Sequence, residues 1–251
     1  MTYQRYFKDL FLSLIIRPLL GDPFRSFVTI VGVAIGIAVF LKGRTWLAVA
    51  AVTGAMLLHP TTAIWFAVLI GIAALVSDRD SRQPILALAG AVASAAAVLL
   101  ASTLREQIVV MNPSWSALLQ TKDYLQATDW PMLTWFANLG LAAIIATVYD
   151  YRRNLRITTP RETGLVAGCA TLLVLFLVSV PLAHAGVALI VQLQFSRIFW
   201  LRELVAITYA VWVVVESPLG TRASSQLPRV RYVAVALVIV ATLTRGSYVT
   251  Y

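Results

Sequence analysis

The sequence has little charge and almost no cysteine. Only 12% of its 251 residues are charged and 60% are apolar, whereas a soluble domain has roughly 25% charged and 45–50% apolar residues. Its one cysteine, Cys169, cannot form an internal disulfide. The P-loop, GxGxxG, GxSxG, CxxC and HExxH motifs are all missing from it. These absences exclude an ordinary cytosolic enzyme, a disordered chain and a secreted disulfide scaffold.

What the sequence has instead is a series of apolar runs along its whole length. A helix that crosses the ~30 Å hydrocarbon core needs about 20 residues, and in lipid it pairs all of its own backbone groups. The runs lack the alternating pattern of strands. We therefore predict an all-α fold, a polytopic transmembrane helix bundle of about eight spans, some of them short or broken. The runs are residues 26–41, 45–58, 61–77, 85–101, 133–149, 162–182, 185–215 and 232–243.

The region before these runs is different in character. Residues 3–20 mix basic and acidic side chains with Tyr, Phe and Leu, which favours an amphipathic helix in the membrane interface. We therefore predict an interfacial segment at 1–25 and a transmembrane helical domain at 26–251, with an external loop at 102–132. A basic start without a signal peptide is awkward to place outside the membrane. We hypothesise that an upstream span is missing.

The basic residues predict which helix ends face the cytoplasm. Lys and Arg number 20 against 11 Asp and Glu, and cytoplasmic loops carry an excess of Lys and Arg. Residues 78–83, 151–161 and 219–231 are rich in arginine, so we place them in the cytoplasm. Residues 102–132 hold few basic residues and residues 183–186 hold neither Lys nor Arg, so we place both segments outside. Cytoplasmic loops rich in Lys and Arg therefore explain the net positive charge, and no nucleic-acid partner is needed.

His59-Pro60 interrupts the apolar stretch 45–77, and two interpretations are open. A tight turn makes a hairpin of two short helices and lies outside, since proline is favourable at the first position of a helix. A kink instead leaves one helix of about 50 Å, too long for a ~30 Å core unless strongly tilted, but it puts the basic N-terminal residues in the cytoplasm. We prefer the hairpin.

Charged residues inside apolar runs need a reason, since each costs about 2.5–3.5 kcal/mol at a helix centre. Arg197 is the most informative, because it shares a helix face with Gln194 and lies about 28 Å from the cytoplasmic helix end near Glu216, close to the outer interface. Its guanidinium suits a phosphate group; the alternative is an arginine that anchors the helix among headgroups. Arg202 and Glu203 lie deeper, and we expect each to pair with another helix.

The histidines and the external carboxylates are further candidates. Under the hairpin interpretation His59 lies outside, either as a base or ligand or as a helix-end histidine, and His184 lies in the next external turn. Asp9 and Asp22 also lie outside and could deprotonate an acceptor hydroxyl, although Asp22 equally fits an Asx turn. These residues form no zinc motif, so we predict no metal or other cofactor.

Two short motifs resemble those of a known group of proteins. They are LLHPTTA at 57–63, at an outward turn between short helices, and QFSRIFW at 194–200, which opens a later helix. With the external loops, they resemble the poorly characterised bacterial polytopic proteins grouped near the GT-C glycosyltransferases. The resemblance covers residues 20–216.

The resemblance implies a membrane glycosyltransferase that uses a polyprenyl-phosphate-linked sugar on the non-cytoplasmic side of the bacterial inner membrane. Such enzymes carry a catalytic aspartate in the first external loop, after a first span that is missing here. The catalytic residues so implied are Asp22, Asp9 and His59. The substrate-binding residues so implied are Arg197, Gln194, Arg105 and His184.

Two other classes of function stay open, and with them the question of catalysis. A transporter or flippase needs polar groups near the bilayer midplane on discontinuous helices, for which Arg202 and Glu203 are candidates. A non-catalytic membrane scaffold subunit needs only packing. The predicted partners are membrane lipid and a polyprenyl-phosphate-linked sugar.

Overall fold

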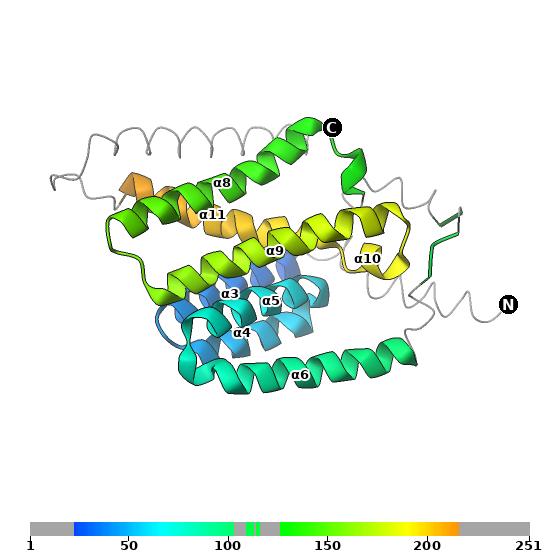
Figure 1. The fold of residues 1–251 in the computed structure, drawn as a ribbon, viewed down its shortest axis with the longest axis horizontal. Coiled ribbons are helices and arrows are strands. Elements are labelled where there is room, and N and C mark those ends of the chain that lie inside the picture. Colours follow the sequence, from blue (N-terminus) through cyan, green and yellow to red (C-terminus); the bar gives the residue numbers. More distant parts are fainter. Residues whose placement is uncertain (1–22, 103–108, 113, 116–125, 216–251) are drawn as a thin grey trace. The chain divides into compact units, whose positions relative to one another are not determined.

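The computed structural model describes residues 23–102, 109–112, 114–115 and 126–215, and in these residues the fold is all helical (Figure 1). Its one strand-like contact there is an isolated pairing of Val110 with Val187. The prediction of an all-α fold is confirmed for this part of the chain. The elements are α3 (Pro23–Leu41), α4 (Thr45–Leu58), α5 (Pro60–Ser77), α6 (Arg79–Ala101), the 3-10 turn η4 (Ala127–Asp129), α8 (Met132–Asn154), α9 (Pro160–His184), α10 (Ala188–Gln192), the 3-10 turn η5 (Phe195–Arg197) and α11 (Ile198–Val215).

Four of the described helices, α5, α6, α8 and α9, are long and apolar enough to cross a membrane. Helix α4 and the 28–41 part of α3 are apolar but shorter. The chain is therefore a helical membrane protein with several spans. The predicted run 232–243 lies outside the described residues, as do residues 1–22 of the interfacial segment and most of the loop 102–132. The predicted boundary after residue 25 is wrong, because residues 23–25 already belong to the first turn of α3.

Local capping groups fix where two of these helices begin. The carboxylate of Asp78 accepts hydrogen bonds from the Ser81 backbone N–H (3.3 Å) and hydroxyl (3.0 Å) at the start of α6. The Thr159 hydroxyl accepts the Glu162 N–H at 3.1 Å, and Pro160 takes the first position of α9. Both caps satisfy N–H groups that a helix start leaves unpaired. They position the segments 78–83 and 151–161, which are joined by an ion pair between Asp78 and Arg161.

By its contacts the chain divides into two units, residues 1–67 and 68–251. In the first unit, α3 and α4 are joined by a short turn in which Gly43 has a φ of +90°. That backbone conformation is readily adopted by glycine, which has no Cβ to clash. The glycine therefore lets the chain reverse between two short apolar helices.

The chain also reverses at His59-Pro60. A Cβ placed on Gly36 of α3 would lie 3.2 Å from the Ala51 Cβ on α4 and 2.5 Å from the Phe66 Cζ on α5. In one continuous helix, residues 51 and 66 would be about 22 Å apart, so they could not both meet Gly36. Figure 1 shows the same reversal. The hairpin prediction is confirmed, and the single kinked helix is wrong.

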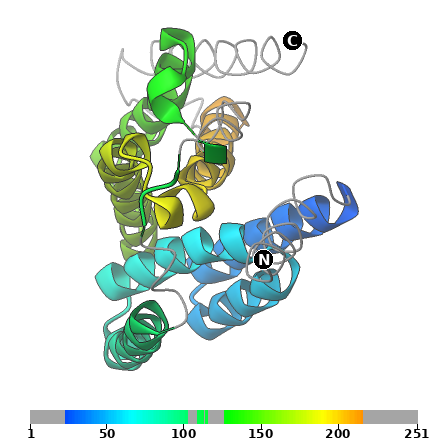
Figure 2. The same cartoon turned by 90° about the vertical axis from the view of Figure 1, so that its right-hand side faces the viewer.

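In the second unit, α8, α9 and α11 lie side by side (Figures 1 and 2). Helix α9 is antiparallel to α11, because Glu162 near the start of α9 bonds to Tyr209 late in α11. Further along, Phe176 of α9 packs against Phe199 at the start of α11. These contacts set the register of α9 against α11 and therefore the depth of every polar group on α11.

The second half of α5 packs closely against α9 within this unit. A Cβ on Gly168 would lie 2.7 Å from the Leu69 carbonyl oxygen, and Gly164, one turn earlier, faces Ala73 and Ser77 as closely. Glycines four residues apart let two membrane helices approach backbone to backbone. This contact fixes α5 against α9 by shape alone.

The two ends of the second unit match the loop pairs expected from charge. At one end, Arg161 donates to the Asp78 carboxylate over 3.1 Å, which joins the segments 78–83 and 151–161. At the other end, the Met111 N–H donates to the Gly186 carbonyl (2.9 Å) and the Ala188 N–H to the Val109 carbonyl (3.0 Å). The loops predicted to share a side of the membrane therefore share an end. We call the first the basic end and the second the distal end.

Candidate functional site

The distal end contains a break in the helical chain. The sequence predicts one apolar run over 185–215, but the structure divides it into α10, η5 and α11. At the break, Gln194 has a left-handed backbone with a φ of +50°. That conformation is uncommon for a residue other than glycine and disfavoured by roughly 1–2 kcal/mol. The apolar run 185–215 is therefore not one continuous helix, because the chain turns at Gln194 before α11 begins.

The break brings together the two residues predicted to share a helix face. The Nε of Arg197 donates to Oε1 of Gln194, and the Gln194 side chain is buried while that of Arg197 is half-buried. Their contact is confirmed, but it spans a 3-10 turn rather than an α-helix. A guanidinium has five donors in a fixed fork. A buried amide that holds one of them therefore sets the direction of the others.

A small pocket lies beside this pair. Its volume is about 20 Å³, enough for one water molecule and too small for a sugar. Gln194 itself lines the pocket, together with Trp130, Phe176, Ser179, Phe195 and Ser196. A larger ligand would therefore cover the mouth of the pocket rather than fill it.

Aromatic rings form the wall of the pocket. Trp130 stacks on Phe176 with ring centroids 5.7 Å apart, and it meets Phe199 at 5.9 Å. Trp135 also packs on Phe176, and its indole N–H donates to the Ala127 carbonyl at 3.2 Å. The two tryptophans therefore pack with Phe176 and Phe199 into one cluster among α8, α9 and α11.

Arg202 lies beyond this cluster on α11. Its side chain is 1% exposed, and its Nη1 has no hydrogen-bond partner among the residues that the structure describes. Its guanidinium carbon lies 5.4 Å from the centroid of the Phe199 ring. The expected pairing of Arg202 with another helix is therefore not found in the described part of the chain.

The structure describes two of the other predicted site residues, His184 and His59. His184 is exposed at the last position of α9, at the distal end. His59 belongs to the first unit, where it is buried and its Nδ1 lies 3.3 Å and 3.4 Å from the hydroxyls of Thr61 and Thr62. That geometry is typical of a histidine that stabilises the turn before α5. Asp9, Asp22 and Arg105 lie outside the described residues.

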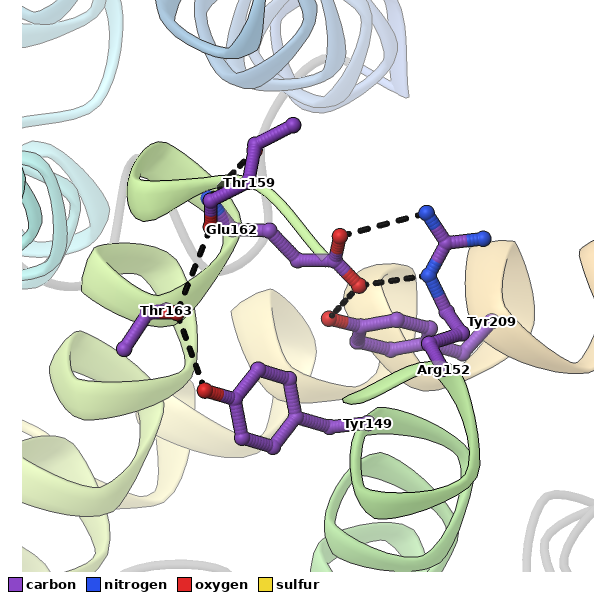
Figure 3. A network of polar contacts seen from close by, with 6 residues as sticks. All are labelled: Tyr149, Arg152, Thr159, Glu162, Thr163 and Tyr209. Atoms are coloured by element: carbon purple, nitrogen blue, oxygen red, sulfur yellow. Dashed lines mark hydrogen bonds and ion pairs between the residues drawn. The ribbon is translucent and has the colours of Figure 1, made fainter. Parts of the chain in front are cut away.

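A polar cluster that the sequence analysis did not single out lies at the basic end (Figure 3). The Glu162 carboxylate accepts from Arg152 Nε (2.6 Å) and Nη2 (3.2 Å) and from the Tyr209 hydroxyl (3.0 Å). Arg152 also lies over the Trp212 ring, 4.1 Å from its centroid. Nearby, the Tyr149 and Thr163 hydroxyls are 2.9 Å apart. The cluster joins α8, α9 and α11, because the Glu162 carboxylate on α9 accepts hydrogen bonds from both of the other helices.

The sequence did carry a signal for Glu162. Thr159 and Glu162 have the spacing of a capping box, a threonine followed three residues later by glutamate. Thr159 caps the helix as that pattern predicts, while the glutamate side chain turns to Arg152 instead of back to Thr159. The pattern therefore predicts the start of α9, but it does not predict that Glu162 packs against Arg152.

Among the described residues, no three His, Cys, Asp or Glu side chains are placed to hold a metal ion. Comparison with protein-family models, with curated proteins and with solved structures finds no match. The candidate site consists of an oriented arginine at a helix break, beside a small pocket with an aromatic wall.

Proposed function

We propose that this chain is a membrane glycosyltransferase of the GT-C-like kind, which binds a polyprenyl-phosphate-linked sugar at the distal end. The observation that carries the proposal is the Gln194–Arg197 pair at the break before α11. Arginine is the residue of choice for phosphate, because its planar fork pairs with two oxygens at once. A buried amide that orients the guanidinium lowers the entropy lost on binding.

The surroundings of the pair suit the two parts of such a donor. The aromatic wall formed by Trp130 offers an apolar ring face near the phosphate-binding group, against which a sugar ring can pack. The distal end is also the end predicted to face outward, where a lipid phosphate lies at the interface. We infer that the donor head lies across the mouth of the pocket, with its lipid tail in the bilayer.

The proposed reaction is a direct displacement at the anomeric carbon of the sugar. The acceptor hydroxyl attacks that carbon, the bond from the carbon to the phosphate oxygen breaks, and polyprenyl phosphate leaves. Asp22 or Asp9 would take the proton of the hydroxyl. Arg197, with Arg105 and His184 as further candidates, would stabilise the charge of the departing phosphate.

The test is sugar transfer by the full chain in proteoliposomes, with a panel of polyprenyl-phosphate-linked hexoses as donors. We expect Arg197→Ala to lower kcat/KM about 100-fold, as loss of one charge-stabilising donor does, and Arg197→Lys to recover part of it. Asp22→Asn and Asp9→Asn identify the base. Arg153→Ala, an exposed arginine at the basic end, is the matched control. Full activity in both aspartate variants and in Arg197→Ala would overturn the proposal.

A transporter or flippase is the second candidate, because the chain between α9 and α11 is discontinuous. Broken helices inside a bundle are typical of transporter binding sites. The same proteoliposomes decide between the two functions. Movement of a labelled polyprenyl phosphate between leaflets, without sugar transfer, would favour transport.

A further inference from the structure

Arg202 occupies a position where an arginine is costly. It lies on the buried face of α11, in line with Ile198, Val205 and Tyr209, and only 1% of it is exposed. An arginine cannot lose its proton in a protein. A buried charge destabilises the fold unless another charge or hydrogen-bonding groups compensate it.

Contacts on either side of Arg202 fix its depth. Tyr209, two turns later, bonds to Glu162 near the basic end, whereas Phe199, one turn earlier, packs on Phe176 at a centroid distance of 4.6 Å. Along α9, Phe176 lies about 21 Å from Glu162. The guanidinium reaches back toward Phe199, as helical side chains tilt toward the N-terminus. It therefore lies well inside the ~30 Å hydrocarbon core.

The described acidic groups nearest in the fold do not neutralise it. Glu162 already accepts from Arg152 and Tyr209. Glu203 follows Arg202 directly, so it points about 100° away around the helix. The titratable group of α9 that interacts electrostatically with Arg202 is Cys169, a buried thiol. The Nη1 donor is left without a hydrogen-bond partner among the described residues.

We propose that Arg202 anchors an oxyanion site inside the membrane-spanning part of the second unit, and that its ligand carries a phosphate group. Phe199 separates this site from the pocket, since it contacts Trp130 of the pocket wall on one side and the guanidinium on the other. The positive end of α11 adds to the attraction for an anion. The site is distinct from the Gln194–Arg197 pair and does not depend on the proposed sugar transfer.

The test is the thermal unfolding midpoint of the full chain in nanodiscs of neutral phosphatidylcholine. Inorganic phosphate is exchanged for chloride at constant ionic strength, and a second set of nanodiscs contains phosphatidic acid. The Arg197→Met background removes the other phosphate candidate. In that background we expect a rise of roughly 5–10 °C near saturation with phosphate or with phosphatidic acid. Adding Arg202→Met should abolish this rise, whereas adding Arg153→Met should leave it unchanged.

The midpoint without ligand gives an independent readout. Arg202→Met alone should raise it, because methionine fills a similar volume without a buried charge to compensate. A lower midpoint, or failure to fold, would show that the charge has a partner within the chain, and it would overturn the proposal. So would the absence of a rise in the Arg197→Met background, or its persistence in the double variant. A response to phosphatidic acid alone identifies a lipid headgroup, and a response to inorganic phosphate identifies a soluble ligand.

Discussion

The hydroxyl of Tyr209 donates a hydrogen bond to the Glu162 carboxylate, 3.0 Å away, although the two residues are 47 positions apart. The same carboxylate oxygen accepts from Arg152 on α8 at 2.6 Å. One acidic group therefore joins three helices at the basic end. Its replacement should therefore weaken the packing of all three helices.

Glu162→Gln should destabilise the chain more than any exposed carboxylate change. Arg152 is only 16% exposed, so the substitution leaves a largely buried guanidinium without its counter-charge. We expect the free energy of unfolding to fall by about 2–3 kcal/mol, somewhat below the value for a fully buried pair. Tyr209→Phe removes one hydrogen bond to a charged group and should cost about 1.5 kcal/mol. The measurement is unfolding of the purified chain in detergent, followed by circular dichroism.

Asp150→Asn is the matched control for this prediction. Asp150 accepts a hydrogen bond from Asn154 at 3.2 Å in an exposed position, so the change should stay within about 0.5 kcal/mol. If Glu162→Gln is no worse than Asp150→Asn, the polar cluster does not hold the helices together.

Gly168→Ala should push α5 away from α9. The new Cβ would lie 2.7 Å from the Leu69 carbonyl oxygen, which is backbone and cannot move aside alone. We expect a loss of about 1–3 kcal/mol in the free energy of unfolding, as for other overpacked positions. The control is Gly71→Ala, which has open space around its Cβ and should gain up to about 1 kcal/mol in a helix. Equal effects at both positions would contradict the close contact.

Gln194 allows the backbone conformation and the side-chain contact to be tested separately. Gln194→Gly and Gln194→Ala both remove the amide that orients Arg197, so both should weaken polyprenyl phosphate binding to the same extent. The glycine variant should nevertheless be more stable by about 1 kcal/mol, because a left-handed backbone disfavours alanine. The measurements are binding in nanodiscs and thermal unfolding of each variant.

The same pair of substitutions at Gln192 serves as the control. Gln192 ends the short helix α10, and there glycine should be less stable than alanine by up to about 1 kcal/mol. Glycine should therefore be the more stable replacement at Gln194, and alanine the more stable replacement at Gln192. The same order at both positions would exclude a left-handed conformation at Gln194.

Much of the fold could be predicted from the sequence, because its signals are local. The bounds of α4 match the predicted run 45–58, since a glycine turn precedes it and His59-Pro60 follows it. The pairing of the loops at each end of the second unit followed from arginine content alone. These features depend on hydrophobicity, on proline and on charge, which can be read position by position.

The site could be predicted only in part, because its main features are not local. Run 185–215 contains neither proline nor a glycine near position 194, so its composition does not mark the left-handed turn at Gln194. Glu162 and Tyr209 are far apart in sequence, and their contact depends on how α9 packs against α11. Likewise, whether Arg202 Nη1 has a hydrogen-bond partner among the described residues depends on which groups of α8 and α9 reach α11. Tertiary packing decides each of these points.

The orientation of the second unit can be tested by labelling in intact bacterial cells. In a Cys169→Ala background, Ala185→Cys reports on the distal end and Asn154→Cys on the basic end, both at exposed positions. A membrane-impermeant thiol reagent should label the first and not the second until the cells are broken. Labelling of Asn154→Cys alone would reverse the predicted sidedness. Labelling of both would mean that α9 does not span the membrane.

Two backbone hydrogen bonds at the distal end link residues 109–111 to residues 186–188, which are far away in the sequence. Val109 and Met111 are hydrogen-bonded to Ala188 and Gly186, at the entrance to α10. A shift of Val109 or Met111 would therefore displace the entrance to α10, a helix of five residues, and with it the Gln194 side chain that orients the Arg197 guanidinium.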